Sequence, residues 1–197
     1  RGRHGDNIEV CRRTGRRIGG QLQGRGSQPI AIDLARKEVK LAGGATQSYD
    51  KLVVSPGVEL MMDALPGLDT PAARGKILQA WKAGAETVAL RQQLEAMPDG
   101  GVFLLAIPRA PYRCPPGPYE RACQVAAYFK KAKPRSKVLI IDANDDIISK
   151  PALFKKAFND LYKGMVEYRP MNEVKEVDVA GMAVKTDFDT IKGDVLN

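Results

Sequence analysis

Apolar residues are concentrated in the second half of the chain, where continuous runs alternate with stretches of helical spacing. The runs Val102–Ile107 and Lys137–Asp142 are typical of strands that are buried on both faces of a parallel sheet. Apolar residues recur at intervals of three and four over 118–131 and again over 151–163, which predicts two helices. A further helix is predicted to start at Thr87, whose hydroxyl is suited to capping it.

The last quarter of the chain has shorter strand signals, at 166–168, 174–184 and 188–196. The segment 63–86 contains many Pro and Gly residues and is expected to be irregular. Alternation of strands and helices indicates an α/β fold class. We expect a Rossmann-like domain of the FAD/NAD(P)-binding type, with a parallel central sheet and an antiparallel β flap formed by the late strands.

The first half has weaker signals. Two short strands are predicted at 30–34 and 38–41, followed by a polar loop at 43–50. The run Lys51–Ser55 is predicted to be a buried strand, and Pro56-Gly57 after it is a strong turn signal.

Charge is distributed unevenly along the chain. The sequence has 197 residues, 31 Lys+Arg, 23 Asp+Glu and a net charge of +8. Residues 1–29 hold seven Arg and two acidic residues, so most of the excess lies there. This segment is either an arm that binds acidic surfaces or a disordered or non-native end, and the lack of aromatic residues among the arginines favours the second interpretation. The rest has an ordinary charge balance, so we expect no nucleic-acid partner.

Several function classes are disfavoured by what the sequence lacks. It has one His and three Cys, which makes a structural metal site improbable and leaves no plausible Ser-His-Asp triad or Cys–His pair. No apolar run is long enough to span a membrane.

The loop after Val102–Ile107 stands where a Rossmann domain has its Gly-rich turn. It has five prolines between Pro108 and Pro118 and a single Gly. Such a loop cannot form the G-x-G-x-x-G turn, and each proline removes an N–H that could bind phosphate. Asp142 is at the position of a ribose-binding acid. Without the glycines, however, this single acid is only weak support for NAD binding. We therefore expect a domain of dinucleotide-binding shape that does not bind NAD.

The same loop carries Cys114, at the sheet edge where ligands of α/β proteins bind. Arg113 and the start of the following helix both favour a thiolate, and Glu120 lies close enough in sequence to accept a proton. The alternative is a small apolar residue packed in a rigid turn, and these residues alone leave the two interpretations nearly equal. Cys123 is expected to belong to the core, although a Cys114–Cys123 pair is possible in principle. Asp142, Asp145 and Asp146 are interpreted as a solvated strand end.

The run from Tyr112 to Ala122, YRCPPGPYERA, resembles the active-site cysteine loop of the flavoprotein subunit of flavocytochrome c sulfide dehydrogenase. This subunit is related to the pyridine nucleotide-disulfide oxidoreductases. Further similar stretches occur from about residue 31 to the end. They are 42–45, 49–57, 80–84 and 133–138.

The resemblance implies an enzyme that oxidises sulfide with FAD in the bacterial periplasm and passes electrons to a c-type cytochrome subunit. It implies that Cys114 is half of a redox-active disulfide, that Glu120 manages protons, and that the flavin is contacted by four residues. These are Ser55, Pro56, Gly57 and Pro115. Residues 1–29 do not match, 30–84 would be a partial FAD-domain segment with a linker, and 85–197 would be the second Rossmann-like domain.

The chain departs from the family in lacking the pyrophosphate-binding glycine loop and the second disulfide cysteine. It therefore looks like an internal fragment, and we expect it to hold FAD weakly or not at all and to be inactive alone. Two alternatives remain at this stage. One is a sulfide:quinone oxidoreductase, and the other is a noncatalytic α/β module that docks a protein partner.

Overall fold

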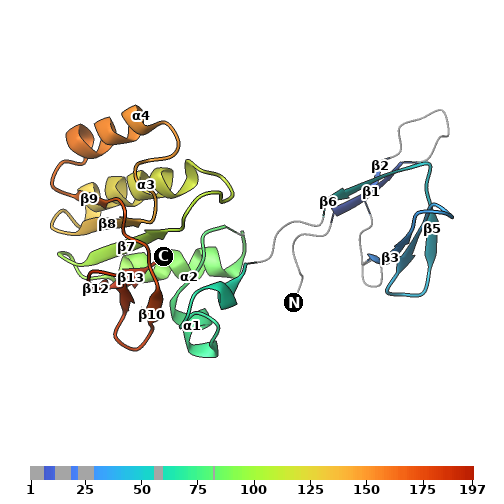
Figure 1. Cartoon of the computed structure of the whole chain (residues 1–197), viewed down its shortest axis with the longest axis horizontal. Coiled ribbons are helices and arrows are strands. Elements are labelled where there is room, and N and C mark those ends of the chain that lie inside the picture. The colour runs from blue at the N-terminus through green and yellow to red at the C-terminus, as the bar shows by residue number, and fades with distance from the viewer. Residues whose placement is uncertain (1–6, 12–18, 22–28, 56–59, 82) are drawn as a thin grey trace. The chain divides into compact units, whose positions relative to one another are not determined.

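The structure is a computed structural model that describes residues 7–11, 19–21, 29–55, 60–81 and 83–197. The chain divides into two compact units, residues 1–60 and 61–197, and each is described by itself (Figure 1).

The described residues of the first unit form two three-stranded antiparallel sheets. Their strand orders are β2-β1-β6 and β3-β4-β5. The strands are β1 (Asn7–Cys11), β2 (Gly19–Gln21), β3 (Pro29–Asp33), β4 (Glu38–Leu41), β5 (Thr46–Ser48) and β6 (Lys51–Ser55). The described parts of residues 1–29 thus include two strands, and the interpretation of that segment as a non-native end stays a prediction.

Two expectations for this unit are wrong. β6 is a strand but not a buried one, since Val53 and Val54 are 51% and 47% exposed. Neighbouring residues of a strand point to opposite faces, so both faces of this part of the strand are accessible. The predicted loop 43–50 contains β5, because Gly44 adopts a φ of +84° that lets the chain turn tightly back onto β4.

The second unit is built on a parallel sheet of order β13-β7-β8-β9, which confirms the expected α/β fold class. Its strands are β7 (Val102–Ile107), β8 (Lys137–Asp142), β9 (Val166–Arg169) and β13 (Val195–Leu196). Helix α3 (Gly117–Ala132) connects β7 to β8. Helix α4 (Pro151–Lys156) continues as a π-helical turn (Ala157–Leu161) and connects β8 to β9.

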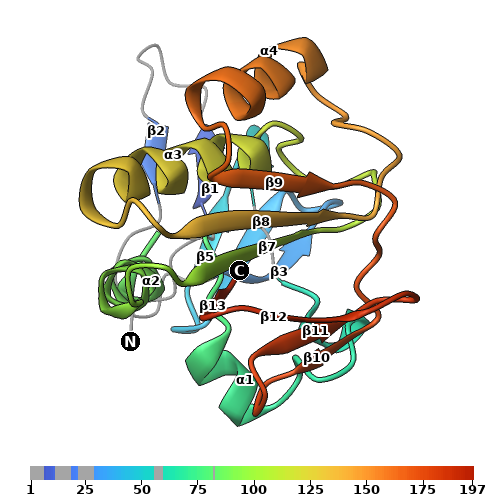
Figure 2. The ribbon, with the colours of Figure 1, turned by 90° about the vertical axis from the view of Figure 1, so that its left-hand side faces the viewer.

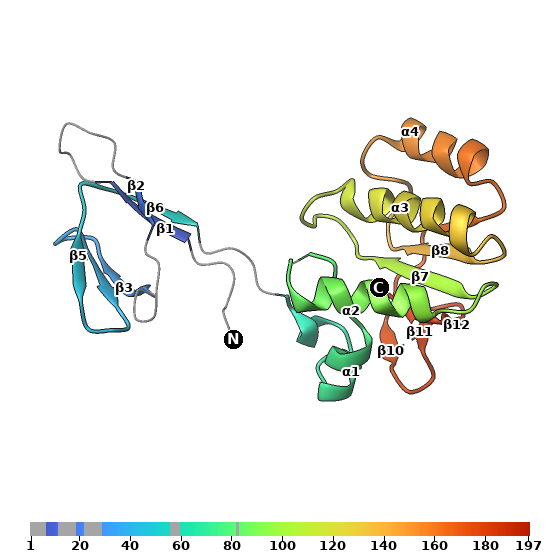
Figure 3. The ribbon, with the colours of Figure 1, turned by 180° about the vertical axis from the view of Figure 1, so that it is seen from behind.

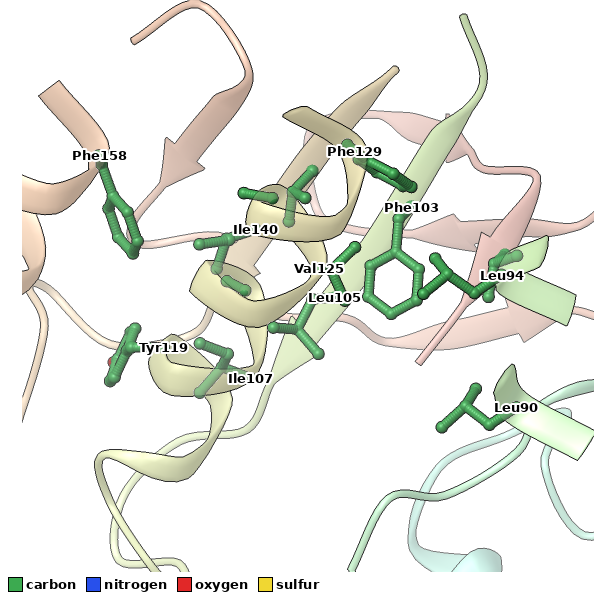
Figure 4. Packing of buried hydrophobic residues seen from close by; sticks show 14 of the residues in the cluster. Leu90, Leu94, Phe103, Leu105, Ile107, Tyr119, Val125, Phe129, Ile140 and Phe158 are labelled. Carbon is green, nitrogen blue, oxygen red and sulfur yellow. The ribbon is translucent and has the colours of Figure 1, made fainter. Parts of the chain in front are cut away.

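Alternate residues of the parallel strands face two different layers. Phe103, Leu105 and Ile107 pack with Ile140 against the helices, and Leu104 packs with Leu139 in a second cluster on the other face. That second face is covered by an antiparallel sheet of β10 (Glu176–Asp178), β11 (Ala183–Lys185) and β12 (Thr190–Lys192). Figures 2 and 3 show α3 and α4 on one side of the parallel sheet and β10–β12 on the other, and Figure 4 shows the core between the helices and the sheet.

Three details of this unit differ from expectation. Helix α2 (Ala85–Ala96) starts after Gly84, so Thr87 lies inside it and is not its cap. Short helices η1 (Met62–Ala64) and α1 (Pro71–Lys76) interrupt the segment expected to be irregular. Strand β13 pairs in parallel with β7 and so belongs to the central sheet, not to the flap.

Candidate functional site

The proline-rich loop leaves the carboxyl end of β7 and presents Cys114 just before α3. The thiol is exposed and free. Cys114 has a φ of +55°, a conformation that a residue with a Cβ adopts at a cost. Its carbonyl oxygen accepts a hydrogen bond from Gly117 N at 2.9 Å, which closes the turn onto the helix. The sequence prediction of a fixed cysteine at this edge of the sheet therefore has a structural basis.

Gly117, the first residue of α3, leaves space that two other side chains use. A Cβ built on Gly117 would lie 3.3 Å from Cys114 Sγ and 3.4 Å from Trp81 Cη2. The sulfur and the indole ring therefore flank the same point at the helix start. Trp81 is 46% exposed, so the thiol lies beside an aromatic surface that solvent also reaches.

Glu120 lies in the first turn of α3 and is exposed. Within the described part of the chain, no hydrogen bond or ion pair joins its carboxylate to Cys114. Its charge acts instead on Cys123, one turn further along the helix. Burial raises the pKa of the Cys123 thiol, and the Glu120 carboxylate raises that pKa further.

Cys123 is half-buried and packs against the main core cluster, as expected. The structure holds Cys114 and Cys123 as two free thiols and not as a disulfide. Because its raised pKa favours the neutral thiol, Cys123 is poorly suited to act as a nucleophile.

Asp142, at the carboxyl end of β8, is fully buried, which corrects its interpretation as part of a solvated strand end. One carboxylate oxygen accepts hydrogen bonds from the Tyr119 hydroxyl at 2.7 Å and the Tyr168 hydroxyl at 3.0 Å. The other accepts from the backbone N and the side-chain amide of Asn144, at 2.9 and 2.7 Å. Four donors satisfy the carboxylate, which explains how a charge is accommodated at this position. Asp145 and Asp146 are exposed, as expected.

Asn144 connects Asp142 to the start of the cysteine loop. Its side-chain oxygen accepts from Ala110 N at 2.9 Å, and its amide group also donates to Pro108 O at 3.0 Å. The loop is therefore hydrogen-bonded to the end of the neighbouring strand.

Tyr112 lies within the loop and close to the same carboxylate. Its hydroxyl lies beside that of Tyr119 and 3.4 Å from Pro115 O, and its one proton can be donated to only one of the two at a time. Burial raises the pKa of Tyr112, and the charge of Asp142 raises it further. The pKa values of Tyr119 and Tyr168 are also raised, in both cases chiefly by burial. All three phenols are therefore protonated at neutral pH and serve as hydrogen-bond donors.

The segment after β9 crosses the same edge of the sheet. Met171 N donates to Asn144 O at 2.9 Å, and Asn172 N donates to Asp142 O at 2.8 Å. Arg109 in the cysteine loop forms a 3.7 Å ion pair with Glu173. These contacts join the segment to the end of β8 and to the cysteine loop, while Tyr119, Tyr168 and Asn144 occupy the Asp142 carboxylate.

The expected flavin contacts are only partly described. Pro56 and Gly57 lie outside the described residues, and the Ser55 side chain is not described either. Pro115 is exposed next to Cys114. Among the described residues, no cluster of three or more His, Cys, Asp or Glu could hold a metal ion. Nor does any helix in the described ranges have the length and apolar character needed to cross a membrane.

Sequence reasoning missed the roles of Trp81, Tyr112, Tyr119 and Asn144. Tyr112, Tyr119 and Trp81 lie in stretches that carry the family resemblance, which was the available signal. Asn144 lies outside them, and nothing in its immediate sequence distinguishes it from a turn residue.

Comparison with known proteins decides the family. Residues 87–197, more than half of the chain, match the family described as sulfide dehydrogenase (flavocytochrome c) flavoprotein chain, central. The chain belongs to this family. Its class as a flavoprotein oxidoreductase, inferred from the resemblance, is thereby supported, and the matched range contains both Cys114 and Glu120.

Solved structures support the fold of this member of the sulfide dehydrogenase flavoprotein family. The chain is similar to the water-forming NADH oxidase from Lactobacillus brevis (TM-score 0.56, 20% identity, covering 86% of this chain and 35% of that one). It is also similar to the reduced CoADR-RHD of Bacillus anthracis (TM-score 0.57, 13% identity, covering 86% and 29%). The chain thus spans about a third of the length of these proteins, and at such identities the likeness shows the fold alone.

Proposed function

We propose that the chain supplies the reactive cysteine loop of a flavoprotein that oxidises sulfide. The observation that carries this proposal is the exposed Cys114 thiol, held at positive φ at the start of α3 in a chain of this family. A docking module would have no use for a thiol held in a strained conformation and left open to solvent. Since the chain spans about a third of its structural relatives, the activity of the whole protein is part of the proposal.

In this proposal Cys114 forms a redox-active disulfide with a second cysteine of the complete protein. Hydrosulfide attacks the Cys114 sulfur, an S–S bond to the new sulfur forms, and the old disulfide breaks to release the second cysteine as a thiolate. The incoming sulfur becomes a persulfide on Cys114. Glu120, in the first turn of α3, is proposed to accept the proton that hydrosulfide carries.

The cofactor would be FAD, with Pro115 and the stretch Ser55, Pro56 and Gly57 proposed as contacts. The described part of this arrangement fits such a group, because Cys114 and Pro115 are both exposed at the sheet edge. When bound, the flavin supplies a two-electron acceptor beside the sulfur. The electrons would pass to a c-type cytochrome subunit in the periplasm. We also propose that this chain alone holds FAD weakly or not at all, and that the second unit takes no NAD because internal partners occupy Asp142.

The domain assignment is likewise a proposal. Residues 30–84 would be a partial FAD-domain segment with a linker, and 85–197 the second domain. The match of the family pattern to 87–197 is consistent with that boundary.

The thiol chemistry is tested without a flavin. Cys114 is converted to a mixed disulfide with glutathione, hydrosulfide is added, and the products are alkylated and mapped by peptide mass spectrometry. We expect a persulfide on Cys114 in clear excess over Cys123, and none at position 114 in Cys114→Ser. Glu120→Gln is expected to slow the reaction at least about tenfold, a modest effect for a proton-transfer residue, whereas the exposed control Glu95→Gln is not.

Formation of glutathione persulfide alone would contradict the proposal. It would mean that hydrosulfide attacks the outer sulfur and that Cys114 acts only as a leaving group.

A further inference from the structure

The buried carboxylate Asp142 has two connections to the loop that presents Cys114. One runs through Asn144 to Ala110 N, at the start of the loop. The other runs through Tyr119, which donates to Asp142, to the hydroxyl of Tyr112, two residues before the thiol. Among the described residues, no hydrogen bond joins any of these groups to the thiol.

The direction of each hydrogen bond follows from the available protons. Tyr119 has one hydroxyl proton and donates it to Asp142 at 2.7 Å. Tyr112 is therefore the donor toward Tyr119, and with one proton it does not donate to Pro115 O at the same time. A charged acceptor strengthens the hydrogen bonds made to it, so the carboxylate polarises the connection to Tyr112.

The loop requires such support because Cys114 adopts a left-handed backbone conformation. That conformation costs a residue with a Cβ about as much free energy as one or two hydrogen bonds return. Without the two connections, the loop would be close to balance between the observed conformation and ordinary extended ones, and the thiol would leave its place beside Trp81.

We propose that Asp142 is a positioning residue for Cys114, acting on its loop through Asn144 and through Tyr119 and Tyr112. The proposal rests on the proposed role of Cys114, but it concerns the placement of the thiol and not the sulfide chemistry. In this chain the acid at the ribose-binding position of a dinucleotide-binding fold is used to hold the reactive loop.

The test measures the loop in the full chain without a flavin. Iodoacetamide is added at neutral pH, and the alkylation rates of Cys114 and Cys123 are determined by peptide mass spectrometry in the same sample. Cys123 is an internal control for general loosening of the unit, because it lies on α3 and packs against the core. Emission from Trp81, the single tryptophan, gives a second and local signal.

We expect Tyr112→Phe to lower the Cys114 rate roughly threefold and Asp142→Asn roughly tenfold, the range that one or a few lost hydrogen bonds support. The Cys123 rate should stay constant, and Trp81 emission should shift in both variants. Loss of rate is expected because a loop released from its hydrogen bonds no longer holds the thiol at the exposed helix start where the reagent reaches it. Tyr128→Phe and Asp146→Asn are matched controls elsewhere on the unit and should change neither signal.

Asp142→Asn could fail to fold, but the half-buried Tyr112 loses only a hydroxyl and keeps the test decisive. The proposal is overturned if Tyr112→Phe leaves the Cys114 rate and Trp81 emission unchanged, or if the Cys114 and Cys123 rates change together. Failure of sulfide to form the Cys114 persulfide would overturn the proposed function and leave this result unaffected.

Discussion

The Tyr119 hydroxyl donates a 2.7 Å hydrogen bond to the Asp142 carboxylate, and neither side chain is exposed to solvent. Tyr119 lies in the first turn of the helix that follows the cysteine loop, and Asp142 ends the next strand. Tyr168 from β9 donates to the same carboxylate oxygen. A single buried acid at the end of β8 therefore joins α3 and β9 at the edge where Cys114 is presented.

Removal of the Tyr119 hydroxyl tests the contribution of this hydrogen bond to stability. Tyr119→Phe leaves Tyr168 as the remaining donor to that carboxylate oxygen, so we expect the free energy of unfolding to fall by about 1–3 kcal/mol. Urea denaturation followed by Trp81 fluorescence reports on the unit that contains both residues. The control is Tyr128→Phe, for which a loss below about 0.5 kcal/mol is expected. Equal losses in the two variants would contradict the role of the hydrogen bond.

From the pKa values of the same phenols we predict how the free energy of unfolding changes at alkaline pH. Burial and the Asp142 hydrogen bond raise the pKa of Tyr119 above its ordinary value of 10.0, and burial and the Asp142 charge raise that of Tyr168. The folded state therefore disfavours the phenolates. This contribution to stability is complete below the unfolded-state pKa and is lost as pH rises above it.

The expected result is a free energy of unfolding that falls between about pH 9 and about pH 11. The fall should be less steep in a Tyr119→Phe, Tyr168→Phe double variant, and urea titrations at several pH values measure both slopes. Parallel slopes in the two proteins would show that other groups cause the alkaline loss.

Much of the second unit could be predicted from the sequence because its signals are local. The runs that form β7 and β8 are continuous and apolar, and the prediction of both strands is confirmed to the residue. Helix α1 could not be predicted in this way, since Pro71 and Gly75 suggest a break. In the structure Pro71 occupies the first turn, where its missing N–H has no cost, and Thr70 caps the helix by accepting from Ala73 N at 3.0 Å.

In the candidate site, too, only the features with a local signal in the sequence could be predicted. Cys114 could be found from its proline-rich surroundings, which form one continuous stretch. The roles of Asp142 and Asn144 depend on contacts with residues more than twenty positions away, and sequence position alone suggested a solvated acid. Burial of Asp142 is decided by tertiary packing, in particular by the positions of Tyr119 and Tyr168, which a one-dimensional pattern does not contain.

Gly117 offers a test of the crowded point between Cys114 and Trp81. Gly117→Ala would add a Cβ 3.3 Å from Cys114 Sγ, which is tighter than ordinary contact, and 3.4 Å from the Trp81 ring, at the lower limit of ordinary contact. Since the residue does not have a positive φ, the expected effect is local displacement and not backbone strain. We expect Trp81 emission to shift and the alkylation rate of Cys114 to change, with the helix retained by circular dichroism.

The matched control is Gly75→Ala, because nothing lies within 4 Å of a Cβ at that position in α1. Replacing a helical glycine there should raise the free energy of unfolding by up to about 1 kcal/mol and leave Trp81 emission unchanged. If both alanine variants gave the same spectrum, the sulfur and the indole would not share the space at Gly117.

A larger effect on stability is expected from substitution of Lys133, at the opposite end of α3. Its side chain is buried, and its ammonium group donates to the carbonyl oxygens of Glu95 and Met97 at the end of α2. These carbonyls have no further partner within their own helix. Lys133→Met keeps the chain length but removes the donor, and we expect the free energy of unfolding to fall by about 2–4 kcal/mol, as for buried hydrogen bonds to a charged group.

Lys131→Met is the control, since Lys131 is exposed in the last turn of the same helix. Removing this charge should lower the free energy of unfolding by roughly 0.3–1 kcal/mol, the size of its interaction with the helix dipole. Urea denaturation of both variants, followed by Trp81 fluorescence, distinguishes a buried cap from a surface charge. A Lys133→Met protein as stable as Lys131→Met would mean that water replaces the ammonium group without cost, and that the join between α2 and α3 depends on apolar packing alone.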